Sequence, residues 1–112
     1  MPTMSGTGKA DIGVVGLAVM GQNLILNLSD HGFHVVAYNR TVAKVHQFLE
    51  GEAKGRDTIL GAETMEEMVG KLAKPRKVLL MVKAGEVVDE FLGKLLGLLE
   101  PGDIVMDGGN SH

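Results

Sequence analysis

A turn bounded by glycines, Gly-Leu-Ala-Val-Met-Gly at residues 16–21, has the composition of a phosphate-binding loop. The N-terminus of a helix carries unpaired N–H groups and the positive end of the helix dipole, so an anion binds there if the backbone can approach it closely. The common dinucleotide fingerprint is G-x-G-x-x-G, and Ala18 takes the place of its second glycine. The methyl group of Ala18 would hold a pyrophosphate slightly farther out without preventing its binding. The alternative is a turn whose glycines only close a strand–helix connection.

The residues that follow the second predicted strand indicate which dinucleotide would bind. A cofactor with a free ribose 2′-hydroxyl is usually bound by an acidic residue about 20 residues after the glycine turn. That place holds Asn39, Arg40 and Thr41, with no carboxylate. A guanidinium can bind two oxygens of a 2′-phosphate and stack on the adenine, whereas a carboxylate would repel the phosphate. The alternative is an ordinary solvated arginine. We predict NADP rather than NAD.

Hydrophobic periodicity predicts the elements that must hold these turns in place. Short β-branched or apolar runs predict strands over residues 12–15, 33–38, 59–60, 78–82 and 104–106. Helical spacing predicts helices over about 20–31, 42–49, 64–72 and 86–99. Thr41 is a candidate N-cap of the second helix, and Thr64 with Glu67 forms a capping box at the start of the third.

The alternation of strands and helices with short connections predicts an α/β fold, a Rossmann-like doubly wound parallel sheet with right-handed crossovers. In such sheets, ligands bind beyond the carboxyl ends of the strands. Polar or glycine-rich turns fall at those ends at residues 16–21, 39–41, 83–85 and 108–111. The predicted fold therefore brings these turns to one edge, where the chemistry is expected.

Composition limits the classes of function. The chain has 112 residues, a net charge of −3 and no cysteine, which fits one domain and excludes a disulfide scaffold or a thiolate metal site. Acidic residues outnumber basic ones and aromatic residues are few, so no nucleic-acid partner is expected. No apolar run reaches the length of a membrane span, and residues 12–21 lack the flanks and cleavage pattern of a signal peptide. We expect a cytoplasmic protein with a flexible N-terminal tail over residues 1–10.

Several segments together resemble the N-terminal part of the 6-phosphogluconate dehydrogenase family. They are DIGVVGLAVMGQNLILN at 11–27, DHGF at 30–33, YNRT at 38–41, KPRK at 74–77, VKAG at 82–85 and GDIVMDGGNSH at 102–112. The resemblance covers residues 11–112. Alanine at position 18 is itself a habit of this family, whereas related 3-hydroxyacid dehydrogenases carry Gly-Leu-Gly at the equivalent place.

The resemblance implies an NADP-dependent enzyme of the oxidative pentose phosphate pathway, which oxidises and decarboxylates 6-phosphogluconate to ribulose 5-phosphate, CO₂ and NADPH. It also implies the residues that bind the cofactor. Gly16, Leu17, Ala18, Val19, Met20 and Gly21 would contact the pyrophosphate, and Asn39, Arg40 and Thr41 the 2′-phosphate and adenosine. Val82, Lys83 and Ala84 would run beside the adenosine and ribose, and Asn110 would reach both the nicotinamide end and the sugar substrate. Lys83 has an alternative interpretation as a solvated lysine at a strand end.

The same resemblance implies what these 112 residues lack. The family's general-base lysine, general-acid glutamate and substrate loop lie after the matching segment, as do the helical substrate domain and the homodimer interface. No catalytic residue is therefore assigned, and the chain alone is predicted to be inactive. Two alternatives stay open, namely a non-catalytic NADP-binding module and a related 3-hydroxyacid dehydrogenase.

The histidines offer little evidence of a metal site. His31 and His34 have a His-x-x-His spacing, but one would end a helix and the other would start a strand, so their rings should diverge. His31 is more simply a favourable partner for the helix dipole. We expect no metal.

Overall fold

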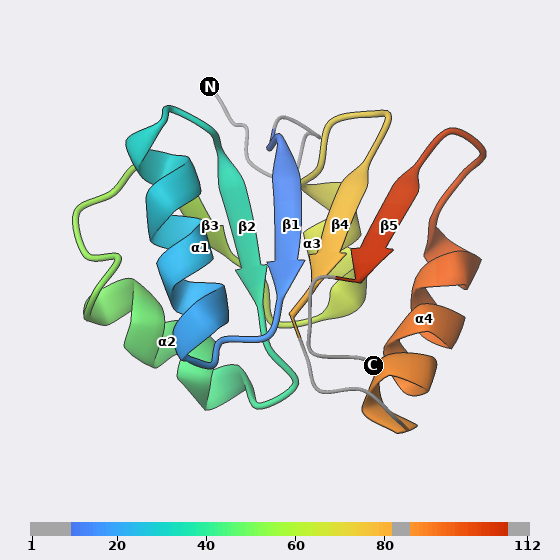
Figure 1. Ribbon diagram of the computed structural model, residues 1–112, viewed down its shortest axis with the longest axis horizontal. Helices are drawn as coiled ribbons and strands as arrows, with labels where there is room; N and C mark the ends of the chain where they lie inside the picture. Colours follow the sequence, from blue (N-terminus) through green and yellow to red (C-terminus); the bar gives the residue numbers. More distant parts are fainter. Residues whose placement is uncertain (1–9, 82–85, 108–112) are drawn as a thin grey trace.

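The computed structural model describes residues 10–81 and 86–107, and Figure 1 shows its strands and helices alternating along the chain. The strands are β1 (Ile12–Val15), β2 (Val35–Tyr38), β3 (Ile59–Gly61), β4 (Lys77–Leu80) and β5 (Ile104–Asp107). The helices are α1 (Val19–Asp30), α2 (Val42–Glu50), α3 (Met65–Gly70) and α4 (Glu86–Leu98).

The strands form one sheet in the order β3-β2-β1-β4-β5, and each neighbouring pair is parallel. The visible arrowheads of β1, β2, β4 and β5 in Figure 1 accordingly point toward the same edge of the sheet. The strand order steps outward from β1 in one direction and then, from β4, in the other. The predicted doubly wound fold is confirmed. The order reverses between β1 and β4, and ligands of such sheets bind beyond the carboxyl ends of the strands at this point. The carboxyl end of β2 lies directly beside that of β1.

Helices cover both faces of the sheet, and alternate strand residues enter two separate cores. Val14, Val35 and Ala37 belong to the core cluster that also holds Ile25 of α1 and Phe48 of α2. The opposite cluster takes the residues of alternating position, with members from α3 and α4: Val15, Val36, Met65, Met68, Val78, Leu80 and Leu95. Strands that are apolar on both faces can only be buried in this way, which explains the unbroken apolar run predicted for β4.

The ends of several elements differ from the predicted bounds. Residues 33 and 34 were expected in the second strand, but β2 begins at Val35 because the N–H of Phe33 bonds to the carbonyl of Leu28 and closes the end of α1 instead. The third helix ends at Gly70 rather than residue 72, and β4 ends at Leu80 rather than residue 82, which lies outside the described residues. In each case a hydrogen bond or a sheet partner sets the boundary, and periodicity does not reveal it.

Ala10 corrects the predicted boundary of the N-terminal tail. Its side chain is buried, its N–H donates to the carbonyl of Lys71, and its carbonyl accepts from the N–H of Ala73. The small side chain fits against the core there, so the packed part of the domain already includes Ala10. Residues 1–9 lie outside the described residues.

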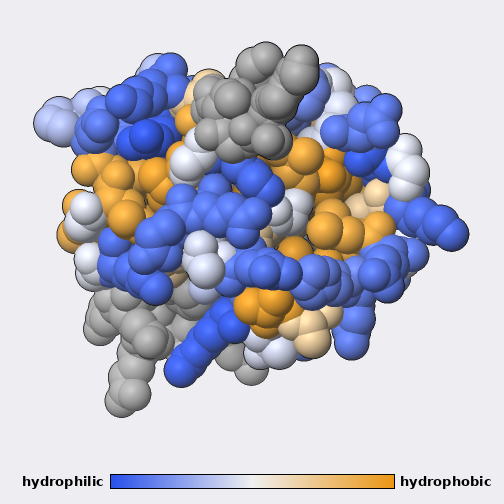
Figure 2. All heavy atoms as spheres, turned by 180° about the vertical axis from the view of Figure 1, so that it is seen from behind, coloured by the Kyte–Doolittle hydropathy of each residue, from blue (hydrophilic) through white to orange (hydrophobic). Residues whose placement is uncertain are grey.

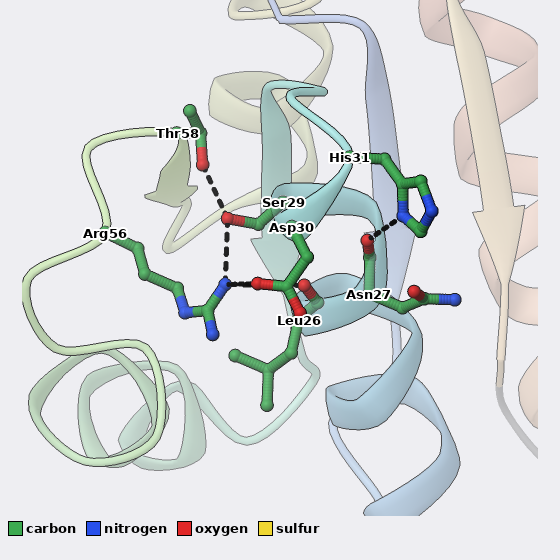
Figure 3. Close-up of polar contacts among 7 residues, drawn as sticks. All are labelled: Leu26, Asn27, Ser29, Asp30, His31, Arg56 and Thr58. Carbon is green, nitrogen blue, oxygen red and sulfur yellow. Dashed lines mark hydrogen bonds and ion pairs between the residues drawn. The ribbon is translucent and has the colours of Figure 1, made fainter.

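The C-terminal end of α1 is held by Arg56 from the loop before β3, as Figure 3 shows. Nη1 of Arg56 lies 2.6 Å from Oδ1 of Asp30 and 3.2 Å from Oγ of Ser29. The Ser29 hydroxyl is in turn 2.6 Å from the hydroxyl of Thr58. These contacts fix the end of α1 that is farther from the ligand-binding edge, and thereby set the direction in which its N-terminus points.

Charged residues also hold the start of β4 against the turn before β5. The side chain of Asp103 is only 3% exposed, and it accepts the backbone N–H of Arg76 at 2.7 Å and that of Glu100 at 2.8 Å. The N–H groups of Glu100 and Arg76 hold the pKa of Asp103 below its usual range, with a further contribution from the Arg76 guanidinium. The carboxylate form is therefore the one that the fold stabilises.

The outer surface is mixed. Figure 2 shows a back face on which polar side chains separate several apolar patches. Within residues 10–81 and 86–107, no helix combines the length and apolar character needed to span a membrane.

We predict that Asp103→Asn makes the domain less stable at pH 7 and that the loss is pH-dependent. The folded pKa is lowered, so the stabilisation is present above the unfolded pKa of about 3.9 and disappears as the pH falls through the folded value. Urea denaturation of both proteins between pH 7 and pH 3 should therefore show curves that converge at low pH. Asp57→Asn, at an exposed aspartate before β3, is the control. A difference that stays constant over this range would contradict the assignment.

Candidate functional site

The turn after β1 continues the sheet pairing before it turns into α1. The N–H of Gly16 donates to the carbonyl of Tyr38 at 2.9 Å, and Gly16 has φ 110°, in the left-handed region that favours glycine. Ala18 is then the extended N-cap residue, and the first helical hydrogen bond runs from the N–H of Gln22 to the carbonyl of Ala18. The chain thus reverses within a few residues at the edge of the sheet.

Position 21 requires glycine for a different reason, which is close packing. A Cβ atom at this position would collide with the carbonyl oxygen of Gly16, which belongs to the backbone and cannot move aside cheaply. The first turn of α1 can therefore lie against the end of β1 only if residue 21 has no side chain. The two glycines of the motif are explained, one by backbone conformation and the other by close packing.

The N-terminus of α1 is open. The N–H groups of Val19, Met20 and Gly21 precede the first helical hydrogen bond and so have no partner within the helix. Ala18 supplies no side-chain cap, and the first turn contains no acidic residue. Val19 and Met20 are 73% and 70% exposed, so the rim of this turn faces outward. The arrangement suits an anion, which the amides and the helix dipole would both stabilise.

The turn after β2 lies next to it and begins a second open helix. Thr41 occupies the N-cap position of α2, as predicted, but its side chain makes no capping hydrogen bond and the first turn again has no acidic residue. The hydroxyl of Thr41 is thus not used to cap α2, and Thr41 and Arg40 are both exposed. Asn39 is half-buried between the two turns, with Oδ1 2.9 Å from the N–H of Leu17.

Helix α3, which starts at the same edge of the sheet, makes an instructive comparison. Oγ1 of Thr64 accepts the N–H of Glu67 at 3.0 Å, and the Glu67 carboxylate accepts the N–H of Glu63 at 2.9 Å. The N–H of Glu63 and the ion pair with Lys71 lower the pKa of Glu67. The chain therefore caps α3 with its own side chains, whereas α1 and α2, beside the ends of β1 and β2, are left open.

The remaining predicted site residues divide into two groups. Leu17 is buried, with its side chain 1% exposed, and its N–H and carbonyl are both engaged by side chains. Val82, Lys83, Ala84 and Asn110 lie outside the described residues.

His31 and His34 contact different groups. Nδ1 of His31 is 2.8 Å from the carbonyl of Asn27, whereas the N–H of His34 donates to Asp11. Figure 3 shows the His31 contact at the end of α1. His46 of α2 is exposed, and its Nε2 lies 2.8 Å from Oε2 of Glu63. Among the described residues no cluster of three potential metal-binding side chains occurs.

Sequence reasoning missed Gln22. Its Nε2 donates to the carbonyl of Leu17 at 2.7 Å and so braces the glycine turn from inside α1. A glutamine one turn into a helix has no distinctive pattern, and only the turn's conformation makes the contact evident.

Together, a parallel sheet of this strand order and a glycine turn leading into an open helix define a dinucleotide-binding domain of the Rossmann class. The model of the NAD binding domain of 6-phosphogluconate dehydrogenase matches residues 11–112. The chain belongs to this family.

Curated relatives agree. The chain is 67% identical over 104 residues to a decarboxylating 6-phosphogluconate dehydrogenase of Aggregatibacter actinomycetemcomitans, covering 93% of this chain and 21% of that protein. It is 62% identical over 110 residues to the corresponding enzyme of Candida albicans, covering 98% of this chain and 21% of that enzyme. The chain therefore spans about a fifth of the length of these relatives.

A solved structure shows the same fold. The 6-phosphogluconate dehydrogenase of Plasmodium falciparum superposes with a TM-score of 0.83 at 48% identity, over 91% of this chain and 22% of that one. That protein was studied in its apo form, with its cofactor NADP+ and with its substrate 6-phosphogluconate.

We predict that Gly21→Ala lowers the free energy of unfolding by about 1–3 kcal/mol, because the new methyl group must push the first turn of α1 away from the Gly16 carbonyl. The matched control is Gly97→Ala in α4, where a Cβ meets nothing within 4 Å. That change should stabilise the domain by up to about 1 kcal/mol through helix propensity. Urea denaturation measures both. Equal stabilisation by the two alanines would contradict the packing role of Gly21.

Proposed function

We propose that this chain is the NADP-binding part of a decarboxylating 6-phosphogluconate dehydrogenase, which converts 6-phosphogluconate to ribulose 5-phosphate, CO₂ and NADPH. The observation that carries the proposal is the family match over residues 11–112, together with two uncapped helices side by side at the carboxyl edge of the sheet. The Plasmodium falciparum relative, studied with NADP+ and with 6-phosphogluconate, supports the choice of cofactor and substrate.

The residues present fit the two charged parts of NADP. The open amides of residues 19–21, with Gly16 and Ala18 alongside, would hold the pyrophosphate, and the absence of acidic residues from the first turn of α1 favours this. Arg40 and Thr41 would hold the 2′-phosphate. Bound NADP+ supplies a hydride acceptor, and the part of this chain is to bind and orient it.

Family membership supports further proposed contacts with the cofactor and the substrate. Val82, Lys83 and Ala84 would lie beside the adenosine and ribose. Asn110 would reach the nicotinamide end and the sugar substrate. Leu17 and Asn39 were expected to touch the cofactor, and their engaged backbone and side-chain groups favour an indirect part for both.

The rest of the enzyme belongs to the same proposal. The general acid and base, the helical substrate domain and the homodimer interface would come from the part of a longer protein that these 112 residues do not include, and we propose a cytoplasmic location. The chain alone should form no NADPH from 6-phosphogluconate, which a spectrophotometric assay of the purified chain checks.

A non-catalytic NADP-binding module would make the same cofactor contacts. Reading the gene beyond His112 separates the two possibilities. A downstream lysine and glutamate in the family's motifs would support the enzyme, and their absence would support the module.

We predict that Arg40→Ala weakens NADP+ binding about tenfold or more and leaves NAD+ binding nearly unchanged. One or two charge-assisted hydrogen bonds to the 2′-phosphate would be lost, and solvent exposure keeps the effect toward the low end of their range. Calorimetric titration of both cofactors against the 112-residue chain measures the change. Lys54→Ala, which removes a positive charge from an exposed side chain of the loop before β3, should change neither affinity. Equal losses for the two cofactors in Arg40→Ala would contradict a contact with the 2′-phosphate.

A further inference from the structure

The carboxamide of Asn39 connects two loops that lie far apart in the sequence. Oδ1 accepts the N–H of Leu17 at 2.9 Å, in the turn after β1. Nδ2 donates to the carbonyl of Thr41 at 3.0 Å, at the start of α2. One side chain therefore bonds to the glycine turn through its acceptor and to the β2–α2 turn through its donor.

Leu17 can transmit the effect of this contact to α1 because its side chain, its N–H and its carbonyl are all held in place. Its side chain lies in the core with 1% exposure, its N–H is bound by Asn39, and its carbonyl accepts Nε2 of Gln22 at 2.7 Å. Ala18 and the open amides of α1 follow directly. A displacement of the Asn39 side chain should therefore displace Leu17 and, with it, the first turn of α1.

We propose that Asn39 is a positioning residue that couples the two halves of the cofactor site, so that the glycine turn and the Arg40–Thr41 turn keep a fixed spacing. The inference rests on the proposed function, in which one turn binds the pyrophosphate and the other the 2′-phosphate. A rigid spacing lowers the entropy that binding must remove when one ligand touches both turns.

The chemistry of the bridge requires an amide. An aspartate at position 39 has acceptors only, so it could still bind the N–H of Leu17 but would face the carbonyl of Thr41 without a proton to share. A carboxylate would therefore lose the hydrogen bond to Thr41 at the start of α2. Its negative charge would in addition repel a 2′-phosphate. Asparagine meets both requirements, because its amide donates to Thr41 and its side chain carries no negative charge.

The test compares three variants of the 112-residue chain by calorimetric titration of NADP+ and NAD+. We expect Asn39→Ala to weaken NAD+ binding because the glycine turn loses its hydrogen bond to residue 39. It should weaken NADP+ binding by a larger factor, roughly tenfold, because NADP+ also depends on the spacing of the two turns. Gln22→Ala should weaken both equally, since it loosens Leu17 from the other side. Arg40→Ala, by contrast, should affect NADP+ alone.

A spectroscopic measurement separates coupling from a general loss of stability. Adenosine 2′-monophosphate carries the 2′-phosphate but no pyrophosphate, so it probes the β2–α2 turn. In the ¹⁵N spectrum of the unaltered chain, saturating it should shift the Leu17 amide resonance. The shift should persist in Gln22→Ala, which keeps the Asn39 bridge, and disappear in Asn39→Ala at concentrations that saturate the variant.

The outcomes are distinct. Loss of NADP+ affinity alone in Asn39→Ala, or a Leu17 shift that survives this substitution, would overturn the coupling and make Asn39 a direct contact or a bystander. Failure of the unaltered chain to bind NADP+ at all would overturn the proposed function and, with it, this inference. If Asn39→Ala is unfolded by circular dichroism, Asn39→Ser, too short to bridge both turns, replaces it with the same expected results.

Discussion

Beyond the last residues of β1 and β2, the pairing of the two strands continues through two further hydrogen bonds. The N–H of Gly16 donates to the carbonyl of Tyr38, and the N–H of Leu17 donates to the side chain of Asn39. The second bond is accepted by a side-chain oxygen and not by the backbone of β2. The chains are thereby free to part, one into α1 and the other into α2, while their starting points stay joined. The geometry of the candidate site depends on this junction.

The junction explains why the two helices can begin without caps. An uncapped N-terminus leaves amides unpaired, and a helix normally satisfies them with its own side chains, as Thr64 and Glu67 do for α3. The positions of α1 and α2 are instead fixed by other contacts. Gln22 bonds to the carbonyl of Leu17 before α1, and Asn39 bonds to the carbonyl of Thr41 before α2. Arg56 holds the C-terminal end of α1 through Asp30. The fold can therefore present open amides to a phosphate without losing the position of the helices that carry them.

Much of this arrangement could be predicted from the sequence because it depends on local patterns. The run at 12–15 matches β1 residue for residue, and the alternation of periods was enough for a parallel doubly wound sheet. Glycines 16 and 21 marked the turn from β1 into α1, where the first supplies a positive φ and the second permits close packing. Thr41 was placed at the N-cap, but its unused hydroxyl could not be foreseen, since capping depends on the rotamer that neighbouring elements permit.

The features that escaped prediction depend on contacts between distant segments. Ala10 looked like part of a polar tail because its two hydrogen bonds are made to residues 71 and 73. Phe33 belonged to an apolar run, yet its N–H closes α1 instead of joining the sheet. The division of the Asn39 carboxamide between Leu17 and Thr41 likewise requires that the ends of β1 and β2 already be adjacent.

We propose that the carboxyl ends of β1 and β2, with the open starts of α1 and α2, form the cofactor-binding edge. The most direct test is a map of backbone amide resonances of the ¹⁵N-labelled chain as NADP+ is added. We expect the large shifts to fall at residues 16–21 and 39–41, with little change at His34, Arg56 and Asp103 on the opposite edge. Shifts concentrated at that opposite edge, or saturable binding that leaves residues 16–21 unperturbed, would contradict this proposal.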